Sequence, residues 1–380
     1  MTASSTRIHG LDTLRALAVT LVVLHHYVLF VSDAPTFGWV GEIGWVGVDL
    51  FFALSGYLIG RQIFAGLSRP GGFSLRRFYA RRLLRTLPNY WVVLALYFLW
   101  PAFRGTAPLL PLWEYAAFVQ NFALEPGSAF SHSWSLAIEE QFYLLLPALA
   151  LLGTMLGALL GRSLRLAWGA IALAFLAGML VRASLWREMA AQDHQLYFYF
   201  KYIYYSSLCR FDELLAGVAL ALLRTHHAGA WARLTRHGNL MGALGLLACA
   251  LAFYFYLDDR YGFGITVFGF PLMGLGFALL IVSAVAPGSL LRDLRVPGAG
   301  PLALWSYAIY LLHKPLCVLA AGWMRELGFG AEHPLTIATL LALSVLGGWL
   351  LYRLVETPFM LLRERYVPGN AAPALSPAPR

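Results

Sequence analysis

Ten apolar stretches, each near the length of one membrane-spanning helix, follow one another along this chain of 380 residues. An α-helix needs about 20 residues to cross the hydrocarbon core of a bilayer. Only 12% of the residues are charged and 59% are hydrophobic, whereas a soluble domain is about 25% charged. We therefore predict an all-α polytopic membrane protein with about ten transmembrane helices. The predicted spans are Leu14–Val31, Val46–Ile63, Pro88–Ala102, Phe142–Leu160, Leu166–Val181, Leu208–Leu223, Leu240–Leu257, Ile265–Val285, Ala303–Met324 and Leu335–Val355.

Positive charges are distributed unevenly between the segments that join these spans. When the N-terminus is placed in the cytoplasm, 20 of the 28 lysines and arginines fall in cytoplasmic segments, 7 fall outside, and Lys314 lies within a span. Cytoplasmic segments of membrane proteins carry such an excess of basic residues. We therefore predict a multi-pass protein of the bacterial inner membrane with both termini in the cytoplasm. The same placement puts the two long loops, residues 103–141 and 182–207, outside.

A single domain is expected to occupy nearly the whole chain. Residues 1–13 are expected to form a cytoplasmic N-terminus and residues 14–358 the transmembrane domain. Residues 359–380 are expected to form a cytoplasmic tail, partly disordered because its end is rich in Pro and Ala. The first span lacks a small-residue cleavage site, so we expect an uncleaved anchor. No appended soluble domain is expected.

Two classes of function are disfavoured by the composition. The net charge of +9 does not indicate nucleic-acid binding, because the arginines border apolar spans and membrane topology accounts for them. The three cysteines all lie in apolar stretches without the spacing of metal ligands. We therefore predict buried thiols and no metal site.

The first span carries the most informative pair of ionisable residues. Arg15 and His26 are 11 residues apart, which at about 100° per residue is about 20° beyond three full turns. They therefore share one helix face, about 16 Å apart along the axis, and His25 lies about 80° from that face. Ionisable residues inside a membrane are usually functional, and we predict a functional role for His26. The alternative is a buried histidine that bonds to a neighbouring helix.

Carboxylates near the outer ends of two spans are candidates for acid–base chemistry. Asp49 lies near the start of the second span, at about the depth expected for His26. Ser135 and Glu139 are four residues apart and share a helix face at the apolar border before the fourth span. A carboxylate at such a border suits proton transfer. The alternative for both acids is stabilisation of a helix start by its dipole.

A dense group of arginines precedes the third span. Seven arginines fall within residues 61–85, and Arg82 and Arg85 are three residues apart and face together. Closely set guanidinium groups bind phosphate through paired hydrogen bonds. The cluster therefore predicts an anion site on the cytoplasmic side, with an ordinary positive-inside cluster as the alternative.

Three further ionisable residues are open to more than one interpretation. Arg210 and Glu213 share a face at the outer end of the sixth span, and they are expected to pair with each other or to support the site. His313 lies ten residues into the ninth span, after Ser306, Tyr307 and Tyr310. Spacing alone does not decide between a core histidine and a cavity residue at this position.

Taken in order, these motifs resemble those of the acyltransferase family 3 membrane proteins, the type that O-acetylates O-antigen and exopolysaccharide. The resemblance extends from about Leu11 to Phe359, with seven blocks in the same order. The departures are Thr13, where the family often has Gly, and His25, which doubles the histidine. The blocks are Leu11-Asp12-Thr13-Leu14-Arg15 with His26; Gly47 to Phe52 with Ser55-Gly56; Arg81 to Arg85 with Pro88; Trp134-Ser135-Leu136 with Glu139 to Tyr143; Arg210 with Glu213 and Gly217; Ser306-Tyr307 with Tyr310 and His313; and Glu356 with Pro358.

This resemblance implies an enzyme, an O-acyltransferase with acyl-CoA, in particular acetyl-CoA, as donor substrate and no bound cofactor. The implied acceptor is a hydroxyl of an extracytoplasmic or lipid-linked glycan, such as a lipopolysaccharide or another polysaccharide, and membrane lipid is the remaining partner. The sequence leaves open the acceptor, the acyl chain, the oligomeric state, and whether His26 takes the acyl group or a proton. The implied catalytic residues are His26, Glu139 and Asp49; the implied donor-binding residues are Arg15, Arg82 and Arg85; and the implied supporting residues are Asp12, Ser135, Arg210, Glu213 and His313.

Two other functions fit parts of the sequence pattern. A glycan or lipid transporter or flippase also places charges within the membrane, but the chain has no internal repeat and its arginine cluster lies on one side only. A glycerolipid-type acyltransferase would have a histidine followed five residues later by aspartate. None of the ten histidines meets that condition.

Overall fold

The computed structural model describes residues 8–69, 72–161, 163–191, 193–367 and 369, and within these ranges it contains helices and no strand. The predicted all-α polytopic fold is confirmed, since eight helices of the described chain are long and apolar enough to cross a membrane. These eight are His9–Ser32, Val46–Leu67, Ser131–Leu160, Ser163–Met189, Gly238–Asp258, Ile265–Val285, Ala299–Glu326 and Pro334–Tyr366.

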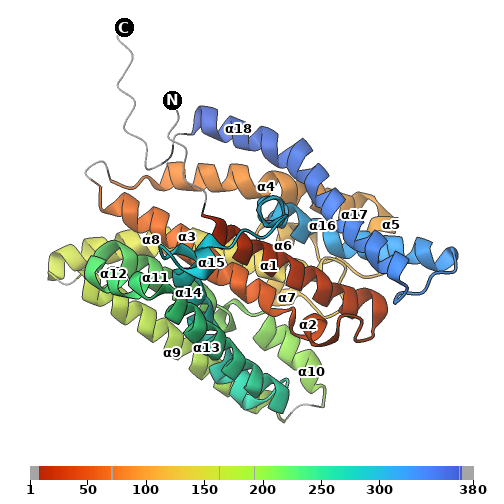
Figure 1. The fold of residues 1–380 in the computed structure, drawn as a ribbon, viewed down its shortest axis with the longest axis horizontal. Coiled ribbons are helices and arrows are strands. Elements are labelled where there is room, and N and C mark those ends of the chain that lie inside the picture. Colours follow the sequence, from red (N-terminus) through yellow and green to blue (C-terminus); the bar gives the residue numbers. More distant parts are fainter. Residues whose placement is uncertain (1–7, 70–71, 162, 192, 368, 370–380) are drawn as a thin grey trace, which may run out of the picture.

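The helices form one elongated bundle (Figure 1). Helices α9 and α13 lie along one side of it, α17 and α18 lie along the opposite side, and α1 and α3 lie between them. The α-helices are α1 His9–Tyr27, α2 Gly38–Ile43, α3 Val46–Leu67, α4 Leu75–Leu99, α5 Pro101–Arg104, α6 Leu112–Ala116, α7 Gln120–Ala123, α8 Trp134–Leu160, α9 Ser163–Met189, α10 Gln195–Phe198, α11 Asp212–His226, α12 Ala228–Arg236, α13 Gly238–Asp258, α14 Phe270–Val285, α15 Leu290–Asp293, α16 Ala299–Glu326, α17 Pro334–Leu351 and α18 Thr357–Tyr366.

Short π-helical and 3-10 segments extend or join several of these helices. Four segments are π-helical: Val28–Ser32, Tyr199–Tyr204, Ile265–Gly269 and Tyr352–Glu356. Two are 3-10 helices: Ser131–Ser133 and Ser207–Cys209. The segment Tyr352–Glu356 makes α17 and α18 one continuous helical rod.

Two of the ten predicted spans fall in helices outside the group of eight. The predicted span Pro88–Ala102 covers the second half of α4, which begins much earlier, at Leu75, and ends at Leu99, and it extends into the start of α5. The predicted span Leu208–Leu223 overlaps α11, which has 15 residues. Helix α11 packs closely on α3 because glycines meet there. A Cβ atom at Gly56 would lie 2.0 Å from the carbonyl oxygen of Leu214, and one at Gly217 would lie 2.2 Å from that of Ala53.

Two ion pairs lie in the protein interior beside these helices. Arg210 pairs with Asp49 of α3, and Arg182 of α9 pairs with Asp212 at the start of α11. All four side chains are almost completely excluded from solvent. The prediction that Arg182 belongs to an outside loop is therefore wrong, because α9 continues to Met189 and carries this arginine into the bundle.

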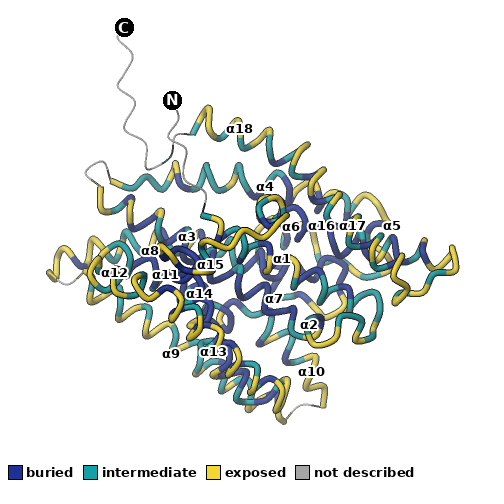
Figure 2. Tube along the Cα trace, viewed as in Figure 1, coloured by how far each residue is buried: buried dark blue, intermediate teal, exposed yellow. Residues whose placement is uncertain are grey.

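The outer surface of the bundle suits a lipid environment. Figure 2 shows the buried residues concentrated in the middle of the bundle, whereas α9 is mainly exposed or half-buried. None of the apolar window of α9 is buried, and exposed leucines such as Leu173 and Leu180 project from it. Exposure of so much apolar surface to water would be unfavourable, so these side chains face lipid.

The C-terminal helix returns to the beginning of α4. Arg81 of α4 lies 2.8 Å from a carboxylate oxygen of Glu364 in α18. Residues 359–366 are helical, so this first part of the predicted tail is ordered secondary structure. The disorder predicted after Tyr366 falls mostly outside the described residues, as do most of the predicted cytoplasmic segment 1–13 and the arginines Arg7, Arg162 and Arg380.

Candidate active site

Three predicted donor-binding residues line one pocket, which we call the arginine pocket. Arg15 comes from α1, and Arg82 and Arg85 come from α4. The 25-residue length of α4 explains this convergence, because both α4 arginines lie well inside the helix and not in a loop before it. Other side chains that line the pocket include Ser55, Ser135, Glu139, Tyr143, Tyr307 and Tyr310.

Arg82 is held in a fixed orientation within this pocket. Its guanidinium carbon lies 3.7 Å from the centre of the Tyr143 ring, and one nitrogen lies 3.3 Å from a Glu140 carboxylate oxygen. Its Nε atom is buried and has no hydrogen-bond partner among the described residues. A guanidinium held in this way is preorganised to donate further hydrogen bonds to an anion.

Glu139 also belongs to the arginine pocket. Ser55 and Tyr143 both donate hydrogen bonds to the same Glu139 carboxylate oxygen. Glu139 and His26 are both implied as catalytic residues by the sequence motifs, but the structure places them in different pockets. The cause is the length of α8, which begins at Trp134 and carries Glu139 more than one turn into the helix.

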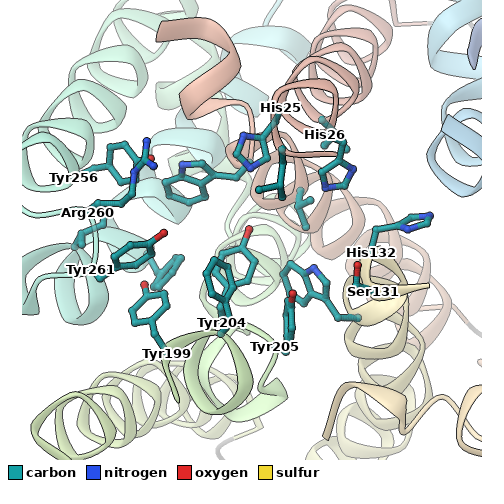
Figure 3. A pocket seen from close by; sticks show the side chains of 18 of the residues that line it. His25, His26, Ser131, His132, Tyr199, Tyr204, Tyr205, Tyr256, Arg260 and Tyr261 are labelled. Atoms are coloured by element: carbon teal, nitrogen blue, oxygen red, sulfur yellow. The ribbon is translucent and has the colours of Figure 1, made fainter. Parts of the chain in front are cut away.

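His26 lines a second and larger pocket, which we call the histidine pocket. Figure 3 shows His25, His26, Ser131 and His132 on one part of its wall, and several tyrosines and Arg260 around the rest. The pocket encloses about 970 Å³ of empty space, its open mouth included, against about 590 Å³ for the arginine pocket. The remaining wall is mostly aromatic and comes from Phe30, Trp45, Trp134, Tyr199, Phe200, Tyr204, Tyr205, Tyr256, Tyr261 and Phe270.

His26 and His313 form a directed hydrogen bond. The His26 Nδ1 atom lies 2.6 Å from His313 Nε2, and the two ring planes are nearly parallel, at 4° to each other, with 4.9 Å between the ring centroids. His313 Nδ1 lies 3.1 Å from the carbonyl oxygen of Ile309 and 2.9 Å from that of Tyr310. A carbonyl only accepts, so Nδ1 of His313 carries a proton and its Nε2 accepts one from His26 Nδ1. In the neutral pair, Nε2 of His26 therefore keeps a free lone pair.

His132 joins this cluster through a gap in the hydrogen bonding of α16. Pro315 has no N–H group, so it cannot bond to the carbonyl of Leu311 one turn earlier. The His132 Nε2 atom lies 3.3 Å from that Leu311 oxygen and serves as its donor. The His132 ring is 5.4 Å from the His313 ring and 6.1 Å from the His26 ring, measured between centroids.

Lys314 of α16 binds the segment that carries His132. Its Nζ atom donates to Ser131 Oγ at 2.6 Å and to the Ser128 carbonyl at 3.2 Å, and it lies 4.2 Å from the centre of the Phe30 ring. The lysine is 8% exposed. Since burial of an unpaired ammonium is expensive, this position points to a role in ordering the histidine pocket.

The two pockets are adjacent and share part of one wall. Val48 of α3 lines both of them. Next to it, Trp134 lines the histidine pocket and Ser135 lines the arginine pocket. The Tyr310 hydroxyl lies 2.6 Å from Ser135 Oγ and donates to the His132 carbonyl at 2.8 Å. A thin layer of side chains therefore separates the arginines from the histidines.

Some of the predicted site residues lie away from both pockets. Asp49 is completely buried in its pair with Arg210 and lines neither pocket. The expected pairing of Arg210 with Glu213 is wrong, because Arg210 pairs with Asp49. Both carboxylate oxygens of Glu213 are buried without a hydrogen-bond partner in the described part of the chain. Asp12 lies in the first turn of α1, one turn before Arg15.

Several residues in or beside the histidine pocket carry little signal in the sequence. No motif marks His132, and Lys314 stands out only as a charge within a span. The signal for Lys314 was its position directly after His313 inside an apolar stretch, where a charge is costly. The tyrosines of the π-helical segment Tyr199–Tyr204 gave no comparable signal, because they come from a loop distant in sequence.

The chain is a multi-pass helical membrane protein in which a pocket rich in arginine lies next to a pocket with a histidine pair. An anion site beside a potential general base is the arrangement expected of a membrane-embedded transferase. The chain belongs to the acyltransferase domain family called acyltransferase 3, whose sequence profile matches residues 8–353. Relatives with curated names include YrhL of Bacillus subtilis (strain 168), a candidate peptidoglycan O-acetyltransferase, 30% identical over 344 residues, which are 84% of this chain and 50% of YrhL. Another is the O-acetyltransferase OatA of Staphylococcus aureus (strain NCTC 8325 / PS 47), 25% identical over 371 residues, which are 92% of this chain and 56% of OatA.

The chain thus spans about half the length of these curated relatives. No solved structure matches it significantly. The family assignment agrees with the resemblance inferred from the sequence motifs, and it covers the segments that build both pockets.

Proposed function

We propose that this protein is an O-acetyltransferase of the bacterial inner membrane that moves an acetyl group from cytoplasmic acetyl-CoA to a hydroxyl of an extracytoplasmic glycan. The observation that carries the proposal is the shared wall at Val48, with arginines on one side and His26 on the other. A donor with an anionic nucleotide and a long neutral arm fits such an arrangement, because its charged and reactive ends need separate environments.

The arginine pocket is the proposed donor site. Arg15, Arg82 and Arg85 offer planar guanidinium groups, which bind phosphate oxygens through paired hydrogen bonds. The dense cluster of arginines around α4 would place this pocket toward the cytoplasm, where acetyl-CoA is made. The pantetheine arm would then pass the wall near Val48 and bring the thioester to His26.

His26 is the proposed general base. Its Nε2 atom takes the proton of the acceptor hydroxyl while that oxygen attacks the thioester carbonyl carbon. The new C–O bond forms, the C–S bond breaks, and the thiolate of coenzyme A takes the proton back from His26. His313 holds His26 in the tautomer that this step requires, through the hydrogen bond at Nδ1. Transfer of the acetyl group to His26 itself is the alternative course of the reaction.

The histidine pocket is the proposed acceptor site. Its aromatic rings present apolar faces against which sugar rings stack, and the tyrosine hydroxyls and Ser131 supply hydrogen-bonding groups. The names of the relatives support this choice, since YrhL and OatA are both named as O-acetyltransferases, and the name of YrhL specifies peptidoglycan.

Transfer of labelled acetyl groups tests the proposal. The purified protein, reconstituted in liposomes with both faces accessible, is given acetyl-CoA labelled in the acetyl group and a panel of cell-wall and capsular oligosaccharides. We expect the label to appear as an alkali-labile ester on at least one glycan, and His26→Ala to abolish it. Movement of a glycan across the membrane without any consumption of acetyl-CoA would instead identify a transporter.

A labelled protein intermediate would separate the two courses of the reaction. If His26 is a base, rapid denaturation near neutral pH leaves no acetyl group on the protein. If His26 takes the acetyl group, denaturation under these conditions, where an acetyl-imidazole survives longer than in acid, leaves label on the peptide that contains His26.

A further inference from the structure

The electrostatic character of the histidine pocket is set by Arg260. This residue follows α13 in the loop before the π-helical segment Ile265–Gly269, and Figure 3 shows it on the opposite side of the pocket from His132. Among the described residues that line the pocket it is the one arginine, with no lysine, aspartate or glutamate. The lining that an acceptor meets therefore carries a positive charge and no carboxylate, although Glu42 lies next to Arg260 outside the lining.

Arg260 is positioned by its contacts with Tyr256, Tyr261 and Glu42. Its guanidinium carbon lies 5.1 Å from the centre of the Tyr256 ring, which keeps the group at the pocket edge. Its ionic partner is Glu42 of α2, at 3.7 Å, beyond the range of a good hydrogen bond. The side chains are 48% and 46% exposed. Such an exposed pair contributes little to stability, so a ligand with a better placed anion can replace Glu42.

From this arrangement we infer that the acceptor carries an anionic group next to the sugar that is acetylated, and that Arg260 binds it. The inference rests on the proposed function and names the class of acceptor. Two sources supply such a group, a carboxylate on the glycan or a phosphate that links the glycan to a lipid. Both suit the planar fork of a guanidinium. The aromatic side chains of the pocket then bind the sugar ring, and Arg260 fixes the orientation of that sugar relative to His26.

Steady-state kinetics with matched acceptors test the inference. The full-length protein is assayed with a neutral oligosaccharide, with the same oligosaccharide in which one hexose is a hexuronic acid, and with the neutral sugar on an isoprenoid phosphate. We expect KM to be lower for at least one anionic acceptor than for the neutral one. Arg260→Ala should raise that KM roughly tenfold, as expected for loss of a charge-assisted contact, and should raise KM for the neutral acceptor by a clearly smaller factor.

The Glu42→Gln variant separates binding of the acceptor from a structural role of the Arg260–Glu42 pair. If Arg260 binds the acceptor, removal of its competitor lowers KM for the anionic acceptor, so Glu42→Gln and Arg260→Ala act in opposite directions. If the pair only stabilises the fold, both variants change all acceptors in the same direction. Arg260→Lys should recover part of the affinity, because an ammonium keeps the charge but lacks the fork.

Arg325→Ala is the matched control, because Arg325 is an exposed arginine of the same predicted outer side and lines neither pocket. It should leave every KM unchanged. Equal KM values for neutral and anionic acceptors in the wild type would overturn the inference while leaving acetyl transfer intact. Absence of transfer to every acceptor would instead contradict the proposed function.

Discussion

The Nδ1 atom of His26 is 2.6 Å from Nε2 of His313, and this contact fixes the protonation pattern of both rings. His313 is itself fixed by the carbonyl of Tyr310 in its own helix. The chain of donors therefore runs from His26 through His313 to the backbone of α16. Its consequence is that the atom of His26 available for chemistry is Nε2.

We expect His26→Ala to abolish acetyl transfer, with coenzyme A binding and folding retained. Loss of a general base lowers the rate by about 10²–10⁴-fold. His25→Ala should keep substantial activity, because the His25 Nδ1 atom bonds to the Gly41 carbonyl at 2.8 Å and holds α2 against α1. The measurement is turnover of both purified variants beside their elution profiles. Greater loss in His25→Ala than in His26→Ala would reverse the assignment.

His313→Ala should lower turnover without changing the affinity for acetyl-CoA. Without its acceptor at Nδ1, His26 is free to change tautomer and orientation, and the fraction with Nε2 deprotonated and correctly placed falls. We expect a loss of tenfold or more in kcat, on the order of other changes to a group that orients a base. Kinetic analysis with varied acetyl-CoA measures it. Unchanged kcat would remove His313 from the mechanism.

Arg85→Ala should weaken coenzyme A binding by roughly tenfold to hundredfold, since a hydrogen bond to a charged group contributes about 1.5–3 kcal/mol. Arg82→Ala should have a similar effect, and it also removes the contacts with Tyr143 and Glu140. Arg85→Lys should restore affinity only in part. Calorimetric titration of the protein in detergent checks this. Equal affinities for coenzyme A in the wild type and in the Arg82→Ala/Arg85→Ala double variant would contradict the donor site. The two arginines would then only mark the cytoplasmic side of the membrane.

Glu139→Gln should leave donor binding intact or make it slightly tighter while turnover falls. The glutamine keeps an oxygen for Ser55 and Tyr143 to donate to, but it removes a negative charge from a pocket that binds phosphate. The same titration, combined with a turnover assay, separates the two effects. A loss of donor affinity as large as that of Arg85→Ala would show that Glu139 mainly holds the pocket together.

Asp49→Asn should destabilise the protein more than it alters chemistry. It leaves the fully buried Arg210 without its counter-charge, and breaking a buried pair in this way typically destabilises by about 3–5 kcal/mol. Replacing both partners, with Arg210→Gln added, should recover part of the lost stability. Thermal unfolding in detergent provides the comparison. A stable but inactive Asp49→Asn variant would support the catalytic role that the sequence motifs imply for Asp49.

The sequence was sufficient for the fold class, but not for the depth at which each candidate site residue lies. Arg15, Arg82 and Arg85 were predicted from helical spacing within one helix at a time. The structure keeps those helices, and the three arginines line one pocket. The position of Glu139 was misjudged because the apolar run begins at Phe142 whereas the helix begins at Trp134. Hydropathy detects the part of a helix that faces lipid, and it misses the polar turns that line a cavity.

Contacts between distant segments were beyond the reach of spacing arguments. His132 reaches α16 because Pro315 leaves the Leu311 carbonyl without a backbone donor. That relationship joins two segments about 180 residues apart, and no local periodicity encodes it. Asp49 and Arg210 are likewise brought together by the close packing of α3 on α11 at Gly56 and Gly217.

In the proposed arrangement, with the arginine pocket open to the cytoplasm and the histidine pocket open to the outside, the wall at Val48 would also have to seal the membrane. A bilayer resists the passage of ions through about 30 Å of hydrocarbon, but between the two pockets that resistance would depend on Val48, Trp134 and the contact of Ser135 with Tyr310. A donor arm that passes through this wall would have to fill the opening it makes, or protons would leak beside it. The tight packing of these few side chains would then be a condition for the cell to keep its proton-motive force.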